Sequence, residues 1–127
     1  MRVTCGTDII EIERVKRAIE NSQGDFLDRV FTEREIKYCD GKKQVKYQHF
    51  AGRFASKEAI FKTIASAFED KYLLSWKDIE IINDKTGKPY VNFLENKPIE
   101  LDSIDISISH CKDYAVAYAV AVWKGEK

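Results

Sequence analysis

The chain has 127 residues, of which 44% are hydrophobic and 33% charged, a composition typical of one globular domain with its own core. Its 21 basic and 21 acidic residues cancel, so bulk charge gives no reason to expect DNA or RNA binding, and any anion site must be local. No run approaches the roughly 18 apolar residues of a membrane span, and no signal peptide is visible. We therefore expect a single domain over residues 1–127, in the cytoplasm and without a membrane partner.

The first residues predict a strand followed by a helix. Val3, Thr4 and Cys5 favour a strand that ends near Asp8, a carboxylate flanked by apolar residues. Residues 11–21 then read as an amphipathic helix, with Ile12, Val15 and Ile19 on its apolar side. The opposite side carries Arg14 and Arg17, and it is either an ordinary solvated surface or a docking surface for an acidic partner.

Two short helical segments are expected next. One turn of helix lies around Phe26, and a second helix begins at Thr32, because Thr32 and Glu35 have the spacing of a capping box. That spacing alone gives Glu35 a structural role. The second helix should stop at Asp40-Gly41, and a lysine cluster that includes Lys46 follows it.

A long helix over about residues 45–69 contains the most informative pattern of the chain. Its apolar stripe places a carboxylate, Glu58, in the middle of apolar side chains, with Lys62 one turn further on. The stripe comprises Phe50, Phe54, Phe61, Ala65 and Phe68. Burying an unpaired carboxylate costs several kcal/mol or raises its pKa, so Glu58 should have a partner, which is either Lys62 or a metal ion. A second isolated carboxylate, Asp8, on another element suits Mg²⁺, which keeps waters and takes further ligands from phosphate.

The last third of the chain predicts strands. Ile79 and Ile81 alternate with polar residues, and a turn over residues 83–89 joins them to a strand over 90–93. Residues 104–109 alternate cleanly, and residues 114–123 are apolar on both faces, as expected of a strand that another subunit covers. Helices first and antiparallel strands last predict an α+β fold with a long helix packed on an antiparallel sheet.

Five short motifs, in this order and over nearly the whole chain, resemble the holo-acyl-carrier-protein synthase family, the short bacterial type of the 4′-phosphopantetheinyl transferase superfamily. The motifs are Gly6-Thr7-Asp8-Ile9-Ile10-Glu11-Ile12, Phe31-Thr32 with Glu35, Ala51-Gly52-Arg53-Phe54-Ala55-Ser56-Lys57-Glu58-Ala59 with Lys62, Gly87-Lys88-Pro89-Tyr90, and Ile106-Ser107-Ile108-Ser109-His110. The resemblance implies the 4′-phosphopantetheinyl transferase fold in a single domain over residues 1–127.

The resemblance also implies an activity. This activity is the Mg²⁺-dependent transfer of the 4′-phosphopantetheine group from coenzyme A to a serine of apo-acyl carrier protein, with release of adenosine 3′,5′-bisphosphate, in support of fatty acid biosynthesis. It further implies a homotrimer with sites between subunits. The alternative is a non-catalytic module that binds coenzyme A or a carrier protein.

Catalytic roles follow from the matched positions. The resemblance implies that Asp8 and Glu58 are the Mg²⁺ ligands and that Lys62 neutralises the pyrophosphate of coenzyme A. Three acceptors for the serine proton stay open, namely Glu58, a metal-bound water held near Glu35, and His110.

The same motifs imply binding roles for coenzyme A. Arg53 and His110 match positions near its phosphates, and Ser109 precedes that histidine. The turn Gly87-Lys88-Pro89 matches a segment that lies along the nucleotide, and Lys46 is expected at the 3′-phosphate.

Docking of the carrier protein is expected on the first helix. Arg14 matches a docking position of the family, and Arg17 lies on the same exposed side. Because acyl carrier proteins are strongly acidic, both arginines would speed encounter and fix orientation.

Overall fold

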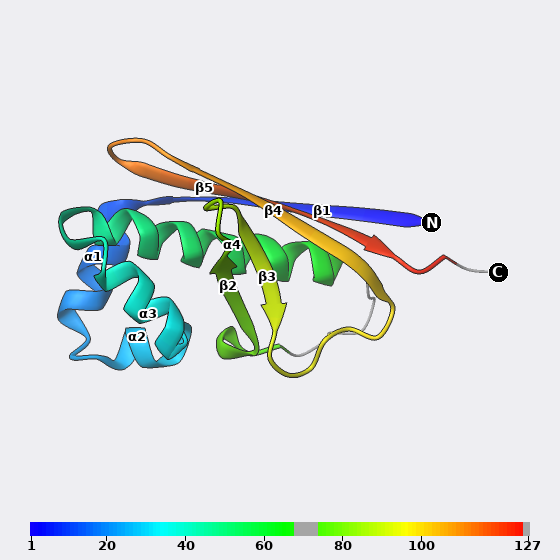
Figure 1. Ribbon diagram of the computed structural model, residues 1–127, viewed down its shortest axis with the longest axis horizontal. Helices are drawn as coiled ribbons and strands as arrows, with labels where there is room; N and C mark the ends of the chain where they lie inside the picture. Colours follow the sequence, from blue (N-terminus) through cyan, green and yellow to red (C-terminus); the bar gives the residue numbers. More distant parts are fainter. Residues whose placement is uncertain (68–73, 126–127) are drawn as a thin grey trace.

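The computed structural model describes residues 1–67 and 74–125. Its main sheet has three antiparallel strands in the order β1 (Arg2–Glu11), β5 (Tyr114–Trp123) and β4 (Leu101–His110). The long helix α4 (Lys46–Ala67) lies along one face of this sheet (Figure 1). The α+β fold with a long helix on an antiparallel sheet is thus confirmed.

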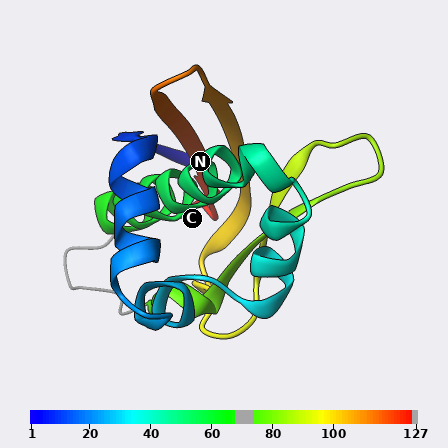
Figure 2. The same ribbon diagram turned by 90° about the vertical axis from the view of Figure 1, so that its left-hand side faces the viewer.

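Two smaller units flank α4. The helices α1 (Ile12–Asn21), α2 (Asp25–Val30) and α3 (Glu33–Asp40) gather at its N-terminal end, and a 3₁₀ turn η1 (Lys43–Val45) leads into it. A second 3₁₀ turn, η2 (Trp76–Asp78), precedes a two-stranded sheet of β2 (Ile79–Asn83) and β3 (Pro89–Phe93). Seen from the end, α1 and the β2–β3 hairpin lie on opposite sides of α4 (Figure 2).

The predicted elements are present, although β4 begins at Leu101, before the predicted residue 104, and the first strand is longer than predicted. The capping box at Thr32 and Glu35 is formed, α3 ends at Asp40 with Gly41 as its C-cap, and β5 has the predicted bounds. However, β1 does not end near Asp8, because it pairs with β5 along its whole length, from Arg2 opposite Trp123 to Glu11 opposite Tyr114. Asp8 therefore lies inside an edge strand.

The expected single apolar stripe of α4 is wrong, because several elements bury this helix from different sides. Ala65 is exposed, while Phe54 and Phe61 are half-buried against Trp76, with ring centroids 5.1 and 5.0 Å from its ring. Phe68 lies outside the described residues. Lys57, not Glu58, is the charged residue that points fully into the interior, and the half-buried Glu58 lies at the edge nearer β1.

Small side chains set the distance between α4 and the sheet. Every second residue of β5 faces the helix, and the alanines at 115, 117, 119 and 121 are at most 1% exposed. On β1, a Cβ at Gly6 would collide with the Ala59 carbonyl oxygen and lie 3.0 Å from Lys62 Cβ. The helix therefore fills the space beneath the middle of the sheet.

We expect Gly6→Ala to destabilise the protein, because the new methyl group meets helix backbone that cannot rotate away. Overpacking of this kind costs about 1–3 kcal/mol, and the free energy of unfolding from urea denaturation measures it. Gly41→Ala is the matched control, because Gly41 has φ −65° and its Cβ would lie 3.4 Å from its nearest neighbours. Equal stability of the two variants would contradict the packing argument.

Candidate functional site

An acidic cluster with one lysine lies where α4 meets β1. Lys62 Nζ is 3.2 Å from Asp8 Oδ1 and donates a hydrogen bond to the Thr7 carbonyl oxygen at 2.9 Å. Glu58 lies one turn before Lys62 on α4, and both carboxylates are half-buried. The sequence offered a Glu58–Lys62 ion pair as one alternative, but the ion pair in the structure joins Lys62 to Asp8. The Lys62 ammonium group is drawn to β1 because it also donates a hydrogen bond to the backbone of that strand.

The electrostatics of this cluster favour a cation. Burial first, and then the nearby Asp8 carboxylate, raise the pKa of Glu58, and the Lys62 ammonium group only partly offsets them. Within residues 1–67 and 74–125 no group of three or more His, Cys, Asp or Glu side chains could hold a metal. Two carboxylates with open coordination fit Mg²⁺, which prefers oxygen ligands and retains positions for water and phosphate. Asp8 and Glu58 are therefore the residues that could hold such an ion.

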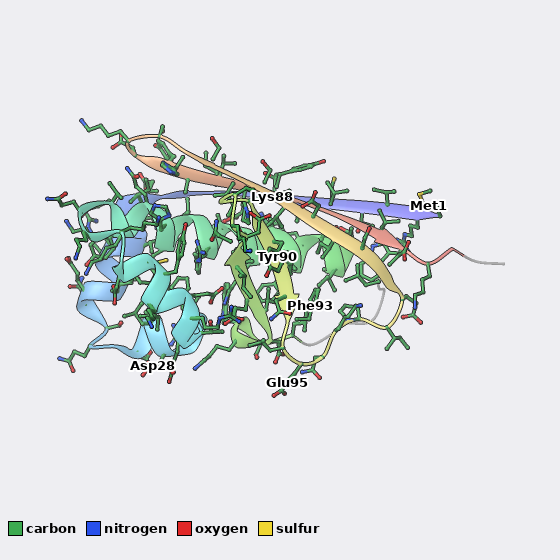
Figure 3. All side chains as sticks on the ribbon, in the orientation of Figure 1. Met1, Asp28, Lys88, Tyr90, Phe93 and Glu95 are labelled. Atoms are coloured by element: carbon green, nitrogen blue, oxygen red, sulfur yellow. The ribbon has the colours of Figure 1, made fainter. Side chains whose placement is uncertain are left out.

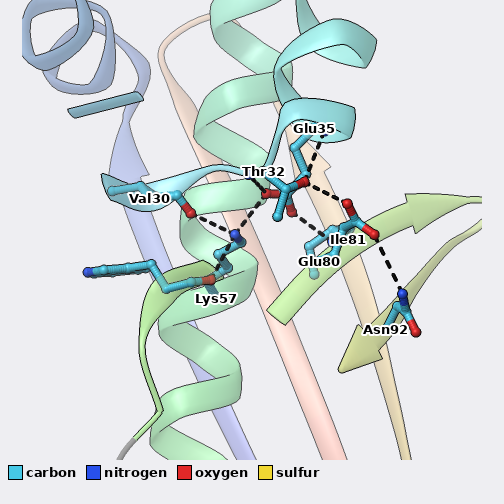
Figure 4. Close-up of polar contacts among 8 residues, drawn as sticks. Val30, Thr32, Glu35, Lys57, Glu80, Ile81 and Asn92 are labelled. Carbon is cyan, nitrogen blue, oxygen red and sulfur yellow. Dashed lines mark hydrogen bonds and ion pairs between the residues drawn. The ribbon is translucent and has the colours of Figure 1, made fainter. Parts of the chain in front are cut away.

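Glu35 occupies a different environment from that cluster. Its carboxylate is fully buried and accepts hydrogen bonds from Lys57 Nζ at 2.8 Å, from the Thr32 backbone N–H at 2.9 Å and from the Ile81 backbone N–H at 2.7 Å (Figure 4). With both oxygens engaged inside the protein, the geometry argues against Glu35 as the residue that holds a reactive water. The capping-box spacing already gave it a structural role, and the buried ion pair extends that role.

A pocket of about 210 Å³ opens on the other side of α4, between that helix, the β2–β3 hairpin and the end of β4. Among the predicted coenzyme A contacts, it brings together Arg53, Gly87, Pro89 and His110. Its remaining lining residues, which the sequence reasoning missed, are Tyr38, Gln48, His49, Gly52, Asn83 and Ile108. His49 could have been found from its position one helical turn before Arg53, which puts both side chains on one side of the helix.

Arg53 is the rigid cation of this pocket. It is 3% exposed, its guanidinium lies 4.1 Å above the centre of the Tyr38 ring, and its Nη2 donates a hydrogen bond to Asn83 Oδ1. Among the described residues, one buried side-chain nitrogen or oxygen atom has no hydrogen-bond partner, and this atom is Arg53 Nε. The guanidinium is thus fixed in place and keeps a donor unused.

Three other predicted contacts lie outside this pocket lining. Lys88 lies at the turn of the hairpin (Figure 3). Its Nζ is 3.0 Å from Asp105 Oδ1. Lys46 Nζ lies 4.0 Å from Asp40 Oδ1. Ser109 follows Ile108 on β4, so the alternation of the strand turns it to the sheet face that α4 does not cover.

The predicted docking arginines line a shallow groove between α1 and α2. Arg14 and Arg17 are both exposed there, and Arg17 Nε lies 3.3 Å from Glu13 Oε2 on the same helix. The structure adds Phe26 and Arg29 from α2, which the sequence reasoning did not include. Only the packing of α2 against α1 brings these residues to the groove.

The acidic cluster and the Arg53 pocket lie at opposite edges of the main sheet. Asp8 is on β1, whereas Ile108 and His110 are on β4, and β5 runs between these strands. The helix α4 touches both edges, because Lys62 bonds β1 and a Cβ at Gly52 would meet Ile108 at 3.0 Å. Within one copy of the chain, the helix therefore separates the two parts.

The fold and these two charged regions define a small α+β domain suited to a phosphorylated ligand. The chain belongs to the 4′-phosphopantetheinyl transferase superfamily, whose family model matches residues 4–119. The resemblance found in the motifs is thereby confirmed.

Similar proteins agree on the family. The holo-[acyl-carrier-protein] synthase of Ruminiclostridium cellulolyticum is 46% identical over 125 residues, which cover 94% of this chain and 92% of that protein. A crystal structure of the holo-(acyl-carrier-protein) synthase of Bacillus anthracis in complex with CoA (3′,5′-ADP) is 33% identical, with a TM-score of 0.76 and 96% of each chain covered. That of Helicobacter pylori, in complex with coenzyme A, is 29% identical, with a TM-score of 0.77, and the match covers 93% of this chain and 99% of that one.

We expect Glu58→Gln to raise the melting temperature at pH 7. Because folding raises the pKa of Glu58 above its ordinary value of 4.5, ionising this carboxylate costs stability once the pH exceeds that value. The gain should therefore vanish below about pH 4, where the carboxyl group is protonated in both states. Thermal melts of both proteins without divalent cations, from pH 4 to pH 8, measure it.

Glu95→Gln, at an exposed position outside the site, is the control and should give no such gain. A melting temperature of Glu58→Gln that falls below wild type at pH 7 would contradict this account of the cluster.

Proposed function

We propose that this protein transfers the 4′-phosphopantetheine group of coenzyme A to a serine of apo-acyl carrier protein in a Mg²⁺-dependent reaction. The names of its relatives and their complexes with coenzyme A support the substrates. The observation that carries the proposal is the cluster of Asp8, Glu58 and Lys62, which combines two half-buried carboxylates with an exposed cation. A non-catalytic binding module would not need this combination.

The reaction is a displacement at phosphorus. The serine oxygen forms a bond to the β-phosphorus of the pyrophosphate, the bridging P–O bond breaks, and adenosine 3′,5′-bisphosphate leaves with the electron pair. Positioning and neutralisation of charge supply most of the acceleration in such reactions. When bound by Asp8 and Glu58, Mg²⁺ would supply charge neutralisation at the pyrophosphate oxygens.

The side chains of the cluster have distinct tasks in this proposal. Asp8 and Glu58 hold the cation from two separate elements, β1 and α4. Lys62 is about half exposed, at 54% of its side chain, and can therefore turn from Asp8 toward a phosphate oxygen without loss of packing. Of the three proton acceptors considered, Glu58 and His110 remain, because the carboxylate of Glu35 is occupied by its own buried hydrogen bonds.

The groove between α1 and α2 is the proposed docking surface for the acidic carrier protein. Arg14 supplies an exposed cation, and Arg17 and Arg29 stand on either side of the groove, each held by an acid four residues earlier. Charges of this kind speed encounter and fix orientation more than they add affinity. The half-buried Phe26 gives the groove an apolar surface for close contact.

A homotrimer with sites between subunits is part of the proposal, and two observations support it. First, α4 keeps the acidic cluster and the Arg53 pocket of one copy apart, so a single coenzyme A reaches both only across a subunit boundary. Second, β1 and β5 expose large apolar side chains on the sheet face away from α4, with Val3 55%, Ile9 64% and Tyr118 46% exposed.

The cellular setting of this activity is a further part of the proposal. We place the protein in the cytoplasm, where it would supply holo-acyl carrier protein for fatty acid biosynthesis. In the part of the chain that the structure describes, no helix is long and apolar enough to cross a bilayer.

Transfer can be followed by the intact mass of apo-acyl carrier protein after incubation with coenzyme A, Mg²⁺ and the enzyme. With the wild-type enzyme, we expect the mass of one phosphopantetheine to be added to the carrier protein. Asp8→Asn or Glu58→Gln should slow the rate of transfer on the order of a hundredfold or more, because each removes a metal ligand. Chelation of divalent cations should stop the reaction, and added Mg²⁺ should restore it. Glu95→Gln should react like wild type. No mass gain with folded wild-type enzyme would contradict the proposal.

Complementation between inactive variants tests whether sites lie between subunits. Asp8→Asn disables the acidic cluster, and His110→Asp places a negative charge in the Arg53 pocket. If each site combines parts of two copies, random assembly of the two co-expressed chains leaves both parts intact in roughly a quarter of the sites. Each variant alone should be inactive. Mixed assemblies as inactive as the single variants would show that one copy supplies the whole site.

A further inference from the structure

We propose that His49 is a further coenzyme A contact, which binds the phosphomonoester of that substrate and takes up a proton when it does so. The inference rests on the proposed function, since it assigns one group of the same substrate to the Arg53 pocket. It adds to that function a residue outside the matched motifs and a dependence of binding on pH.

The geometry places His49 at the meeting point of three elements. It lies on α4 one turn before Arg53, and its ring centre is 6.1 Å from that of His110 at the end of β4. The Tyr38 ring of α3 is also near, with its centre 5.7 Å from that of His49 and its plane at a steep angle to it. Both histidines and Arg53 line one pocket, so a single bound group can meet all three.

The charged side chains that face His49 are both basic. They are Lys42, which follows α3 and lies over the Tyr38 ring, and Arg53 on α4, and the imidazole of His110 on β4 faces it as well. No carboxylate is among the described residues that line this pocket. The acid nearest along α3, Asp40, is exposed and lies 4.0 Å from Lys46. The pocket therefore concentrates positive charge without a counter-charge from the protein.

This arrangement disfavours a charged His49 while the pocket is empty. Burial first, and then Lys42, Arg53 and His110, lower the pKa of His49 from its ordinary value of 6.5. A bound dianion reverses the electrostatic part of that effect, because it neutralises the cations and accepts a hydrogen bond from the imidazolium. Binding of such a ligand must then raise the pKa of His49 and draw a proton from solution.

Coenzyme A offers two kinds of phosphate to the protein. Its pyrophosphate is assigned above to Asp8, Glu58 and Lys62, which leaves the phosphomonoester on the ribose. A phosphomonoester has a second pKa of about 6 and is thus a dianion at pH 7.5. Arg53, with its guanidinium fixed against Tyr38 and Asn83, and two histidines match the multiple acceptor oxygens of this group.

The sign of the pH dependence follows from this assignment. Above pH 7, the monoester is already a dianion, and His49 is neutral in the free protein. Binding of coenzyme A then adds, on average, a fraction of a proton to His49. The affinity for coenzyme A therefore rises as the pH falls from 8 toward 7. At lower pH, protonation of the free monoester opposes further gain.

Titration calorimetry of the wild-type assembly with coenzyme A tests the proposal without any transfer reaction. Repeating the titration at pH 7.5 in two buffers of different ionisation enthalpy gives the number of protons taken up. The second ligand is 3′-dephospho-coenzyme A, which lacks the monoester. We expect proton uptake with coenzyme A and none with the dephospho form.

His49→Gln keeps a hydrogen-bond donor but cannot become charged. We expect it to bind coenzyme A roughly tenfold more weakly and without proton uptake, because it loses one charge-assisted hydrogen bond. Its affinity for the dephospho form should stay close to that of wild type. Lys37→Gln, which removes an exposed positive charge from the same helix as Tyr38, should alter neither quantity.

Two results would overturn the proposal. One is a His49→Gln variant that binds coenzyme A with unchanged affinity and proton uptake. The other is uptake that survives His49→Gln but disappears in His110→Gln, since it would assign the proton to the other histidine. Wild-type protein that binds neither form of coenzyme A would instead defeat the proposed function itself.

Discussion

The buried ion pair between Lys57 and Glu35 is the interaction on which the arrangement of the helices and the hairpin depends. Both side chains are fully buried, and Lys57 Nζ also donates to the carbonyl oxygens of Val30 at 2.7 Å and Trp76 at 3.0 Å. One ammonium group thus joins α4 to the end of α2, to α3 and to η2, while Glu35 joins α3 to β2 through Ile81. A buried pair of this kind persists only when its hydrogen bonds are complete, and losing one partner costs about 3–5 kcal/mol.

This fixed point explains why neighbouring residues of α4 face such different surroundings. Successive helical side chains are about 100° apart, so Lys57 in the interior turns Glu58 toward β1 and leaves Arg53, one turn earlier, beside the hairpin. The hairpin is held by the same network, because Glu35 binds Ile81 and Thr32 donates to Glu80 Oε2 at 2.6 Å. The two charged regions of the molecule are therefore positioned by one interior anchor.

The sequence predicted the elements of the fold better than the surroundings of the charged residues. Local patterns were sufficient for the capping box at Thr32, for the hairpin turn and for the bounds of β5. A single apolar stripe was the wrong pattern for α4, because the sheet, the hairpin and the other helices bury this helix from several sides. The stripe predicted that Glu58 lies among apolar side chains, whereas the structure buries Lys57. Helical spacing places His49 on the same side of α4 as Arg53, but the positions of His110 beside it and of Arg29 beside α1 depend on packing between elements, which periodicity along one element cannot reveal.

The strand β1 carries both a residue of the proposed metal site and part of the proposed subunit contact surface. Its alternation turns Asp8 toward α4 and the neighbouring Ile9 outward, where Ile9 is 64% exposed together with Val3 and Tyr118. The small residues of β5 and Gly6 bring α4 so close that no ligand can pass beneath the sheet from one charged region to the other. In the proposed homotrimer, a second copy would complete the site that close packing divides within one copy, and the exposed apolar side chains of β1 and β5 would be its contact surface.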